Sequence, residues 1–279
     1  MAVARLTGSG GGAPPAASAF PQMLALSNVS KRFTVDDREF VAVTDVNLDI
    51  AAGEFVCVVG PSGCGKSTLL MMMAGLLAPS SGRIEMAGTE VTSPAPSRGV
   101  VFQEGGVLPW RTVLRNVTYG LELQGSGTRS ERIGRAREYL RMVGLADFEN
   151  RLPKELSGGM RQRLAIAQSL VCDPQVLLMD EPFGALDAFT RESLQLALLD
   201  IWENQRTTVC FVTHSVDEAV ILADRIVVMA ARPGRVAMEV SVPLARPRTA
   251  EVRATEEFQK IRQVVWQAMN DQSVVGSDE

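Results

Sequence analysis

The sequence predicts an α/β fold in which helices cover both faces of a central parallel sheet. Four short apolar runs are rich in valine and lack the alternation of a half-exposed strand, which is typical of buried parallel strands. These runs are FVCVV (55–59), VLLM (176–179), TVCFV (208–212) and IVVM (226–229). Segments of helical periodicity separate them, for example STLLMMMAGL (67–76) and RQRLAIAQSLV (161–171). This order of strands and helices predicts a doubly wound core.

Strands of a second kind lie on either side of the first buried run. LALSNVSKRF (24–33), VAVTDVNLDI (41–50) and GRIEMAG (82–88) alternate apolar with polar residues. Such alternation indicates an antiparallel sheet with one face in water. We therefore expect an N-terminal antiparallel β subdomain beside the parallel core.

Composition limits the class of protein. With 279 residues, 46% of them hydrophobic, the chain can bury a substantial core. A net charge of −4 gives no bulk basic character, so we expect no nucleic-acid partner. The four cysteines form no CxxC pair, which predicts reduced thiols without a disulfide or metal site. The most apolar stretch, residues 68–78, has about half of the ~20 residues needed to span a bilayer.

The segment GPSGCGKST (60–68) directly follows the first buried strand. Gly60, Gly65, Lys66 and Ser67 satisfy the pattern GxxxxGK[ST], in the strand-to-helix context that a phosphate-binding loop requires. The glycines let main-chain N–H groups converge on an anion, and the N-terminus of the following helix adds positive charge. We expect Lys66 to reach the β- and γ-phosphates and Ser67 to bind Mg²⁺. The residues predicted to bind ATP here are Gly60, Pro61, Ser62, Gly63, Cys64, Gly65, Lys66, Ser67 and Thr68. The alternative is a glycine-rich turn that contains a lysine by chance.

Two acidic residues follow a second buried strand, in VLLMDEP (176–182). Asp180 and Glu181 therefore lie at the carboxyl edge of the sheet, where ligands bind in open α/β folds. Asp180 suits Mg²⁺ binding through a water, and Glu181 suits a general base that polarises an attacking water. A helix N-cap would explain one of the two acids but not both.

A second anion site is predicted at the start of LSGGMRQRLAIAQSL (156–170). Ser157, Gly158 and Gly159 would present a hydroxyl, open amides and a helix N-terminus in one direction. LSGGM resembles the LSGGQ signature of ATP-binding cassette (ABC) ATPases and departs from it at Met160. The resemblance extends over about residues 23–240 with the motifs in order. It implies a P-loop NTPase (RecA-like) core with an N-terminal antiparallel β subdomain and an inserted α-helical subdomain.

The resemblance implies roles for further residues. Gln103 matches the glutamine loop, which senses Mg²⁺ and the attacking water, and residues 185–187 match the D-loop. His214 is the only histidine and matches the switch histidine, although an isolated histidine can also be a core residue. Phe33 occupies the position of the aromatic residue that stacks on adenine, with Phe40 as the alternative. The implied catalytic residues are Glu181, His214 and Gln103, and the implied Mg²⁺ ligands are Ser67, Gln103 and Asp180.

The predicted domain organisation has three parts. Residues 1–22 are rich in Gly, Ala, Pro and Ser and are expected to form a disordered tail. Residues 23–245 would form the ABC ATPase domain, with its helical subdomain at about 104–165. Residues 246–279 would form a C-terminal helical extension.

Three segments refine the resemblance. GVLPWRTVLRNV (106–117), NRLPKELSGGMRQR (150–163) and VMAARPGRV (228–236) followed by PLARPR (243–248) are similar to ATPase subunits of bacterial importers for nitrate, sulfonates or taurine. Such a subunit works as a head-to-tail homodimer on membrane permease subunits, and indirectly with a substrate-binding protein. It is peripheral, on the cytoplasmic face of the bacterial inner membrane. The alternative is an ABC ATPase that energises another substrate or a process other than transport.

Two further expectations concern single features. Pro109 and Trp110 make the surface around 103–115 more apolar than an ordinary loop, so we expect a helix of the permease to dock there. The alternative is a local hydrophobic cluster inside the helical subdomain. Cys64 lies beside Lys66 and a helix N-terminus, and we expect its thiol to be the most reactive of the four.

Overall fold

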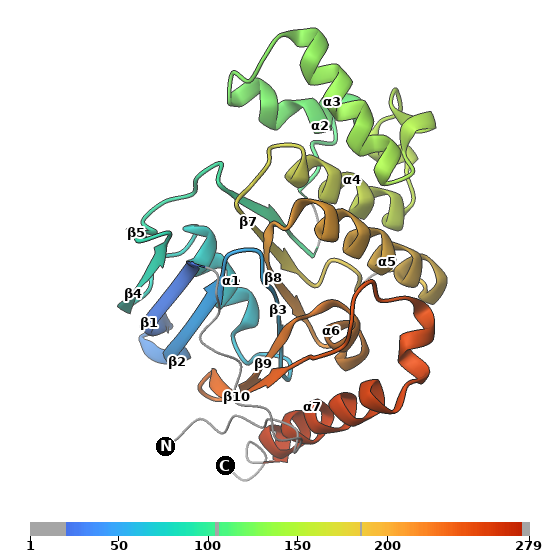
Figure 1. Cartoon of the computed structure of the whole chain (residues 1–279). Coiled ribbons are helices and arrows are strands. Elements are labelled where there is room, and N and C mark those ends of the chain that lie inside the picture. Colours follow the sequence, from blue (N-terminus) through green and yellow to red (C-terminus); the bar gives the residue numbers. More distant parts are fainter. Residues whose placement is uncertain (1–20, 104–105, 185, 275–279) are drawn as a thin grey trace. The chain divides into compact units, whose positions relative to one another are not determined.

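The computed structural model describes residues 21–103, 106–184 and 186–274. The chain divides into two compact units (Figure 1). Within the described residues, unit 1 comprises 21–94 and 206–274, and unit 2 comprises 95–205 apart from 104–105 and 185. In the part of the chain that is described, no helix has the length and apolar character needed to cross a membrane.

An antiparallel sheet forms the first part of unit 1. Its strands are β1 (Gln22–Val35), β2 (Arg38–Ala51), β4 (Ser81–Met86) and β5 (Thr89–Glu90), in the order β2-β1-β4-β5. Along β2, Val46, Leu48 and Ile50 are buried while the residues between them are exposed. The alternation in the sequence therefore corresponds to one packed and one solvated face, and the predicted antiparallel subdomain is confirmed.

The buried runs of unit 1 form parallel strands. The strand order is β10-β9-β3-β8, with β3 (Phe55–Val59) paired in parallel with β8 (Thr208–Thr213) and with β9 (Arg225–Ala230). Strand β10 (Arg235–Ser241) is antiparallel to β9. Every residue of β3 and β8 is buried, which explains their continuous apolar character.

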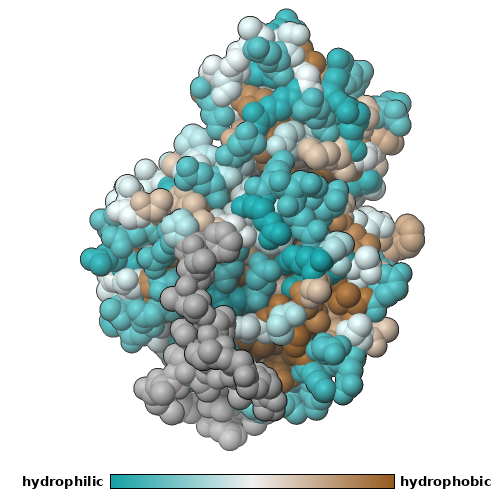
Figure 2. Space-filling model, viewed as in Figure 1, coloured by the Kyte–Doolittle hydropathy of each residue, from teal (hydrophilic) through white to brown (hydrophobic). Residues whose placement is uncertain are grey.

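Four helical segments complete the described part of unit 1. They are α1 (Lys66–Ala74), α6 (Val216–Leu222), the 3₁₀ segment η3 (Ala250–Ala254) and α7 (Glu256–Val274). Helix α1 contacts β8 and β2, whereas α7 packs on β9, β10 and α6. Hydrophobic residues are concentrated on the surface over the region of α6 and α7 (Figure 2). The predicted tail lies outside the described residues except for Pro21 and Gln22, and Gln22 already pairs with Ala51 as the first residue of β1.

The described residues of unit 2 combine two parallel strands with four α-helices. Strands β6 (Arg98–Val101) and β7 (Val176–Asp180) pair with each other. The helices are α2 (Val113–Leu123), α3 (Arg129–Met142), α4 (Gly158–Leu170) and α5 (Ala188–Gln205), with 3₁₀ segments η1 (Ala146–Phe148) and η2 (Pro153–Glu155). Helix α2 packs on α3 and α4, and α4 packs on β6. Unit 2 is thus larger than the predicted helical subdomain, because it also includes β6, β7 and α5.

Candidate nucleotide-binding site

The glycine-rich loop joins β3 to α1. Gly63 has φ +77° and Gly65 has φ +87°, a region of backbone space that favours glycine. A methyl group added to Gly63 would meet no atom within 4 Å. At Gly65 it would lie 2.6 Å from Cγ2 of Val43. Gly65 is therefore required both for its φ angle and for close packing, whereas Gly63 is required for its φ angle.

The end of helix α1 suits an anion. Within the described chain, no side-chain hydrogen bond caps α1 at Gly65, and its first turn contains no acidic residue. When no side chain caps a helix N-terminus, its first main-chain amides are left to donate hydrogen bonds, and phosphate groups can accept them. The donors of this loop therefore fit the triphosphate of ATP.

Lys66 supplies positive charge to the same loop. Its side chain is only 6% exposed, and Nζ donates to the main-chain oxygens of Gly60 at 2.9 Å and Pro61 at 3.0 Å. A lysine ammonium carries three donors, and among the described residues the third here has only the weak acceptor Cys64 Sγ at 3.8 Å, which a bound anion can replace. Burying the ammonium group costs free energy, and bound phosphate groups would compensate that cost.

The surroundings of Cys64 do not favour the predicted reactive thiolate. The residue is 0% exposed, and burial raises the pKa of its thiol. Lys66, whose Nζ is 3.8 Å from Sγ, lowers that pKa by a smaller amount. The expectation of a reactive thiolate is wrong because the desolvation of the charged form outweighs the nearby lysine.

A support for the loop was missed by the sequence analysis. Gly234, in the turn between β9 and β10, donates its N–H to the Ala42 oxygen at 3.0 Å and accepts from the Thr44 N–H at 2.8 Å. A methyl group on Gly234 would lie 2.1 Å from the Cys64 oxygen. The turn therefore packs directly beneath the phosphate-binding loop. The only signal in the sequence is ARPG (231–234), within one of the subfamily segments.

His214 lies at the same sheet edge as the glycine-rich loop. Val59 and Thr213, the last residues of β3 and β8, are partners in the parallel register. Gly60 and His214 consequently leave adjacent strands at the carboxyl edge, and the His214 side chain is exposed. This placement suits the predicted role of His214 and differs from that of a core histidine.

Unit 2 carries the predicted carboxylates and glutamine. Asp180 ends β7 and is 6% exposed. Glu181 follows with φ +42°, and Gln103 follows β6, whose Val101 is the register partner of Met179. A methyl group on Gly184 would lie 3.8 Å from Glu181 Oε2 and 3.9 Å from Gln103 Nε2. Unit 2 therefore brings Gln103 and Glu181 together, and its donor set suits Mg²⁺, which prefers oxygen ligands.

The signature segment forms the N-terminus of α4. Ser157 is exposed, and its Oγ accepts from the Met160 N–H at 3.2 Å. Gly158 and Gly159 are the first residues of the helix. A methyl group on Gly159 would lie 3.2 Å from side-chain atoms of Leu186 and Thr190, so this glycine lets α4 approach the start of α5.

The remaining predicted residues are placed as follows. Phe33 is half-buried, Phe40 is 54% exposed, and the two are direct cross-strand partners. The assignment of the adenine-stacking aromatic therefore stays a prediction. Ala185 of the D-loop lies outside the described residues, while Asp187 Oδ1 accepts from the Thr190 N–H at 3.0 Å. That main-chain hydrogen bond lowers the pKa of Asp187.

A phosphate loop between a buried strand and a helix, with a buried lysine and with carboxylates at another strand end, defines a P-loop nucleoside triphosphatase. Comparison with known proteins specifies the family. The chain belongs to the ABC transporter family, whose sequence profile matches residues 43–184.

Relatives support the same assignment. A putative ATP-binding protein of Brucella abortus is 54% identical over 233 residues, which cover 84% of this chain and 89% of the relative. A nitrate import ATP-binding protein of Synechocystis is 46% identical, with coverage of 85% and 91%. An aliphatic sulfonates import ATP-binding protein of Bacillus cereus is 45% identical, with coverage of 88% and 94%.

Solved structures agree. A dimeric ATP-binding cassette in a post-hydrolysis state with ADP and Pi is 33% identical and has a TM-score of 0.72, with coverage of 80% of this chain and 100% of that chain. The predicted P-loop α/β fold is therefore confirmed, and the chain is an ATP-binding ATPase of the ABC type.

Proposed function

We propose that this ATPase powers the import of a small anion, such as nitrate, a sulfonate or taurine, through a separate membrane permease. The support is the agreement between the subfamily segments of the sequence and the two importer relatives, which are named for nitrate and aliphatic sulfonates. A different cargo would leave the ATPase site unchanged. The permease and a substrate-binding protein would choose the cargo.

In the proposed site, Lys66 and the amides at the start of α1 bind the phosphates. The Ser67 hydroxyl, the Asp180 carboxylate and Gln103 would hold Mg²⁺, which would offset phosphate charge. The single observation that carries this assignment is the uncapped helix end beside a buried Lys66. Either Phe33 or Phe40 stacks on the adenine.

Hydrolysis needs a base and a group that stabilises charge. Glu181 takes a proton from the attacking water, and Gln103 orients that water. The proximity of both side chains to Gly184 supports this division of work. His214 donates toward the γ-phosphate, where negative charge develops.

The second anion site is proposed to act on another copy of the chain. Ser157, Gly158 and Gly159 of one subunit would close on the γ-phosphate held by Lys66 of its partner in a head-to-tail homodimer. Support comes from the dimeric state of the similar cassette structure. Loss of the γ-phosphate would remove the bridge and reopen the dimer.

The permease is proposed to dock on a groove in unit 2. The groove has a volume of about 560 Å³, and its lining includes Trp110, Leu114, Ile133, Glu122 and the arginines 111, 115, 129 and 132. Trp110 is 73% exposed, so it is not part of a hydrophobic cluster inside the unit. Asn116, which is 0% exposed, fixes the loop by accepting from Leu108 N and donating to the Arg111 oxygen.

Charge indicates the chemistry of the partner. Four arginines and one glutamate line the groove, and Glu122 pairs with Arg111 at 3.0 Å. The groove thus keeps an excess of three positive charges beside an exposed indole. It suits a cytoplasmic helix of the permease that carries carboxylates and an apolar anchor. Docking there would make the protein peripheral on the cytoplasmic face of a bacterial inner membrane.

Reconstitution tests the function directly. The chain is assembled with its permease and binding protein in vesicles, and ATP hydrolysis is measured with nitrate, an aliphatic sulfonate, taurine or maltose outside. We expect stimulation by nitrate, the sulfonate or taurine and none by the uncharged sugar. Stimulation by the sugar alone would contradict the proposed substrate class.

A further inference from the structure

The buried acidic side chains among the described residues are Asp180 and Glu218, each 6% exposed. Asp180 belongs to the nucleotide site, but the mechanism above gives Glu218 no role. Burying a carboxylate is costly unless hydrogen bonds compensate it. Glu218 therefore needs a structural or functional explanation.

Glu218 belongs to a closed ring of hydrogen bonds around the main chain of His214. Thr213 Oγ1 donates to Glu218 Oε2 at 2.5 Å, and Ser215 N donates to Thr213 Oγ1 at 3.0 Å. Glu218 N donates to Ser215 Oγ at 3.3 Å. The ring fixes the residues immediately before and after His214 and leaves the imidazole exposed.

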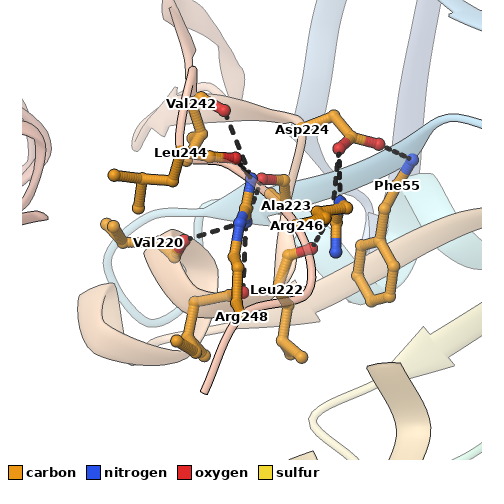
Figure 3. A network of polar contacts seen from close by, with 10 residues as sticks. Phe55, Val220, Leu222, Ala223, Asp224, Val242, Leu244, Arg246 and Arg248 are labelled. Atoms are coloured by element: carbon orange, nitrogen blue, oxygen red, sulfur yellow. Dashed lines mark hydrogen bonds and ion pairs between the residues drawn. The ribbon is translucent and has the colours of Figure 1, made fainter. Parts of the chain in front are cut away.

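Helix α6, which carries Glu218, is fixed at its other end by PLARPR (Figure 3). Arg248 is 4% exposed and donates to the oxygens of Val220 at 3.2 Å, Ile221 at 3.1 Å and Ala223 at 2.7 Å. Its guanidinium also donates to the oxygens of Val242 and Leu244. A cation at the C-terminal end of a helix suits the helix dipole.

Arg246 fixes the junction after α6. Its Nη2 donates to Leu222 O and to Asp224 Oδ1, each at 2.8 Å. Asp224 Oδ2 in turn accepts from the Phe55 N–H, at the start of β3, at 3.0 Å. Helix α6 therefore cannot shift without breaking contacts at both of its ends.

We propose that Glu218 is a positioning residue for hydrolysis, which holds His214 at the sheet edge through Thr213 and Ser215. The proposal rests on the proposed function of His214. A residue that acts only by placing another in reach of the reaction affects turnover more than ATP binding.

Two matched pairs of variants test the proposal in the full-length protein. Thr213→Val keeps the shape of the side chain and removes the hydroxyl, whereas Thr213→Ser retains the hydroxyl. Glu218→Ala removes the acceptor, whereas Glu218→Gln keeps an oxygen that can accept from Thr213. We expect Thr213→Val and Glu218→Ala to lower kcat about 10- to 100-fold, with an ATP Kd within about threefold of the wild type. Thr213→Ser and Glu218→Gln should recover most of the activity.

A double-mutant cycle separates positioning from general damage. In a His214→Ala background, Thr213→Val should lower kcat by less than about twofold, since the group that it positions is already absent. An equal loss in both backgrounds, or a wild-type kcat in Thr213→Val, would overturn the proposal. If Thr213→Val shifts the urea midpoint, the Glu218 pair is used in the same cycle. A wild-type kcat in His214→Ala itself would instead refute the proposed role of His214.

Discussion

Val59 and Thr213 are paired residues at the ends of the parallel strands β3 and β8, so the phosphate-binding loop and His214 begin at neighbouring points of one sheet edge. Gly60 and His214 are 154 positions apart in the sequence. The main-chain hydrogen bonds between β3 and β8 nevertheless fix the points at which they leave the sheet. In unit 2, the pairing of Val101 with Met179 does the same for Gln103 and Asp180. The proposed site residues of unit 1 and those of unit 2 are therefore each positioned by the ends of hydrogen-bonded strands.

Glu181→Gln should bind ATP but turn it over at least about 10²-fold more slowly. The amide keeps the shape of the side chain and removes the proposed base. ATP should then hold the variant as a dimer on a sizing column, while wild-type protein elutes as a monomer once its ATP is hydrolysed. Wild-type turnover by Glu181→Gln would remove Glu181 from the role of base.

The four thiols should differ in their reaction with iodoacetamide. Cys172 is half-buried, whereas Cys57, Cys64 and Cys210 are each 0% exposed. Burial raises the pKa of Cys64 and of Cys172, so both should react slowly at neutral pH, and access should then decide between them. We expect Cys172 to be labelled first, by peptide mass spectrometry, and Cys64 to stay unlabelled with or without Mg-ATP. Faster labelling of Cys64 than of Cys172 would show that the loop opens in solution.

The case of Cys64 shows what the sequence could predict and where it failed. Local patterns were enough for the buried strands, the alternating sheet and the loop GPSGCGKST, because each depends on residues near one another in the chain. The burial of Cys64 depends instead on tertiary packing, and the turn at Gly234, which packs against the Cys64 main chain, is distant in sequence. The ring between Thr213 and Glu218 was missed for a different reason, since an acid in an amphipathic helix is usually solvated.

Arg248→Ala should destabilise the protein by about 1–3 kcal/mol, because truncation leaves buried carbonyl groups without a charged donor. Arg235→Ala is the control, since Arg235 is exposed and its loss should change stability by less than about 0.5 kcal/mol. The difference in the free energy of unfolding is measured by urea unfolding, with the fluorescence of a probe attached to α7 as the signal for unit 1. Equal midpoints for the two variants would show that the contacts of Arg248 contribute little net stability.

Trp110→Ala and Arg115→Glu should reduce the stimulation of ATPase activity by the permease. The first variant removes the exposed anchor of the groove, and the second introduces repulsion against a partner that carries carboxylates. Stimulation is measured as the ratio of rates with and without permease, which cancels differences in basal activity. Trp266→Ala is the matched control, because Trp266 is also exposed, at 56%, but lies on α7. A ratio that falls only with Trp266→Ala would move the docking surface to unit 1.

A mixture of two inactive variants decides whether Ser157 acts on its own chain or on its partner. Lys66→Ala loses the cation that meets the phosphates, and Ser157→Arg blocks the second anion site, so each variant should be inactive alone. A mixture should regain activity at the one composite site that joins an intact Lys66 to an intact Ser157.

Substitution of Ser157 also removes a helix cap, because its Oγ accepts from the Met160 N–H. That cap is worth about 1 kcal/mol of stability. Ser157→Ala removes the cap and the proposed donor without adding bulk, so its comparison with Ser157→Arg isolates the effect of the added arginine. Loss of one preorganised donor to developing charge costs about 10²–10³ in kcat, or ~2.7–4 kcal/mol, so even partial rescue would exceed the background. ATPase activity is scored against the mixing ratio at saturating ATP with the permease present. Activity that stays at the level of the separate variants, although heterodimers form, would mean that the signature of α4 serves the nucleotide of its own chain.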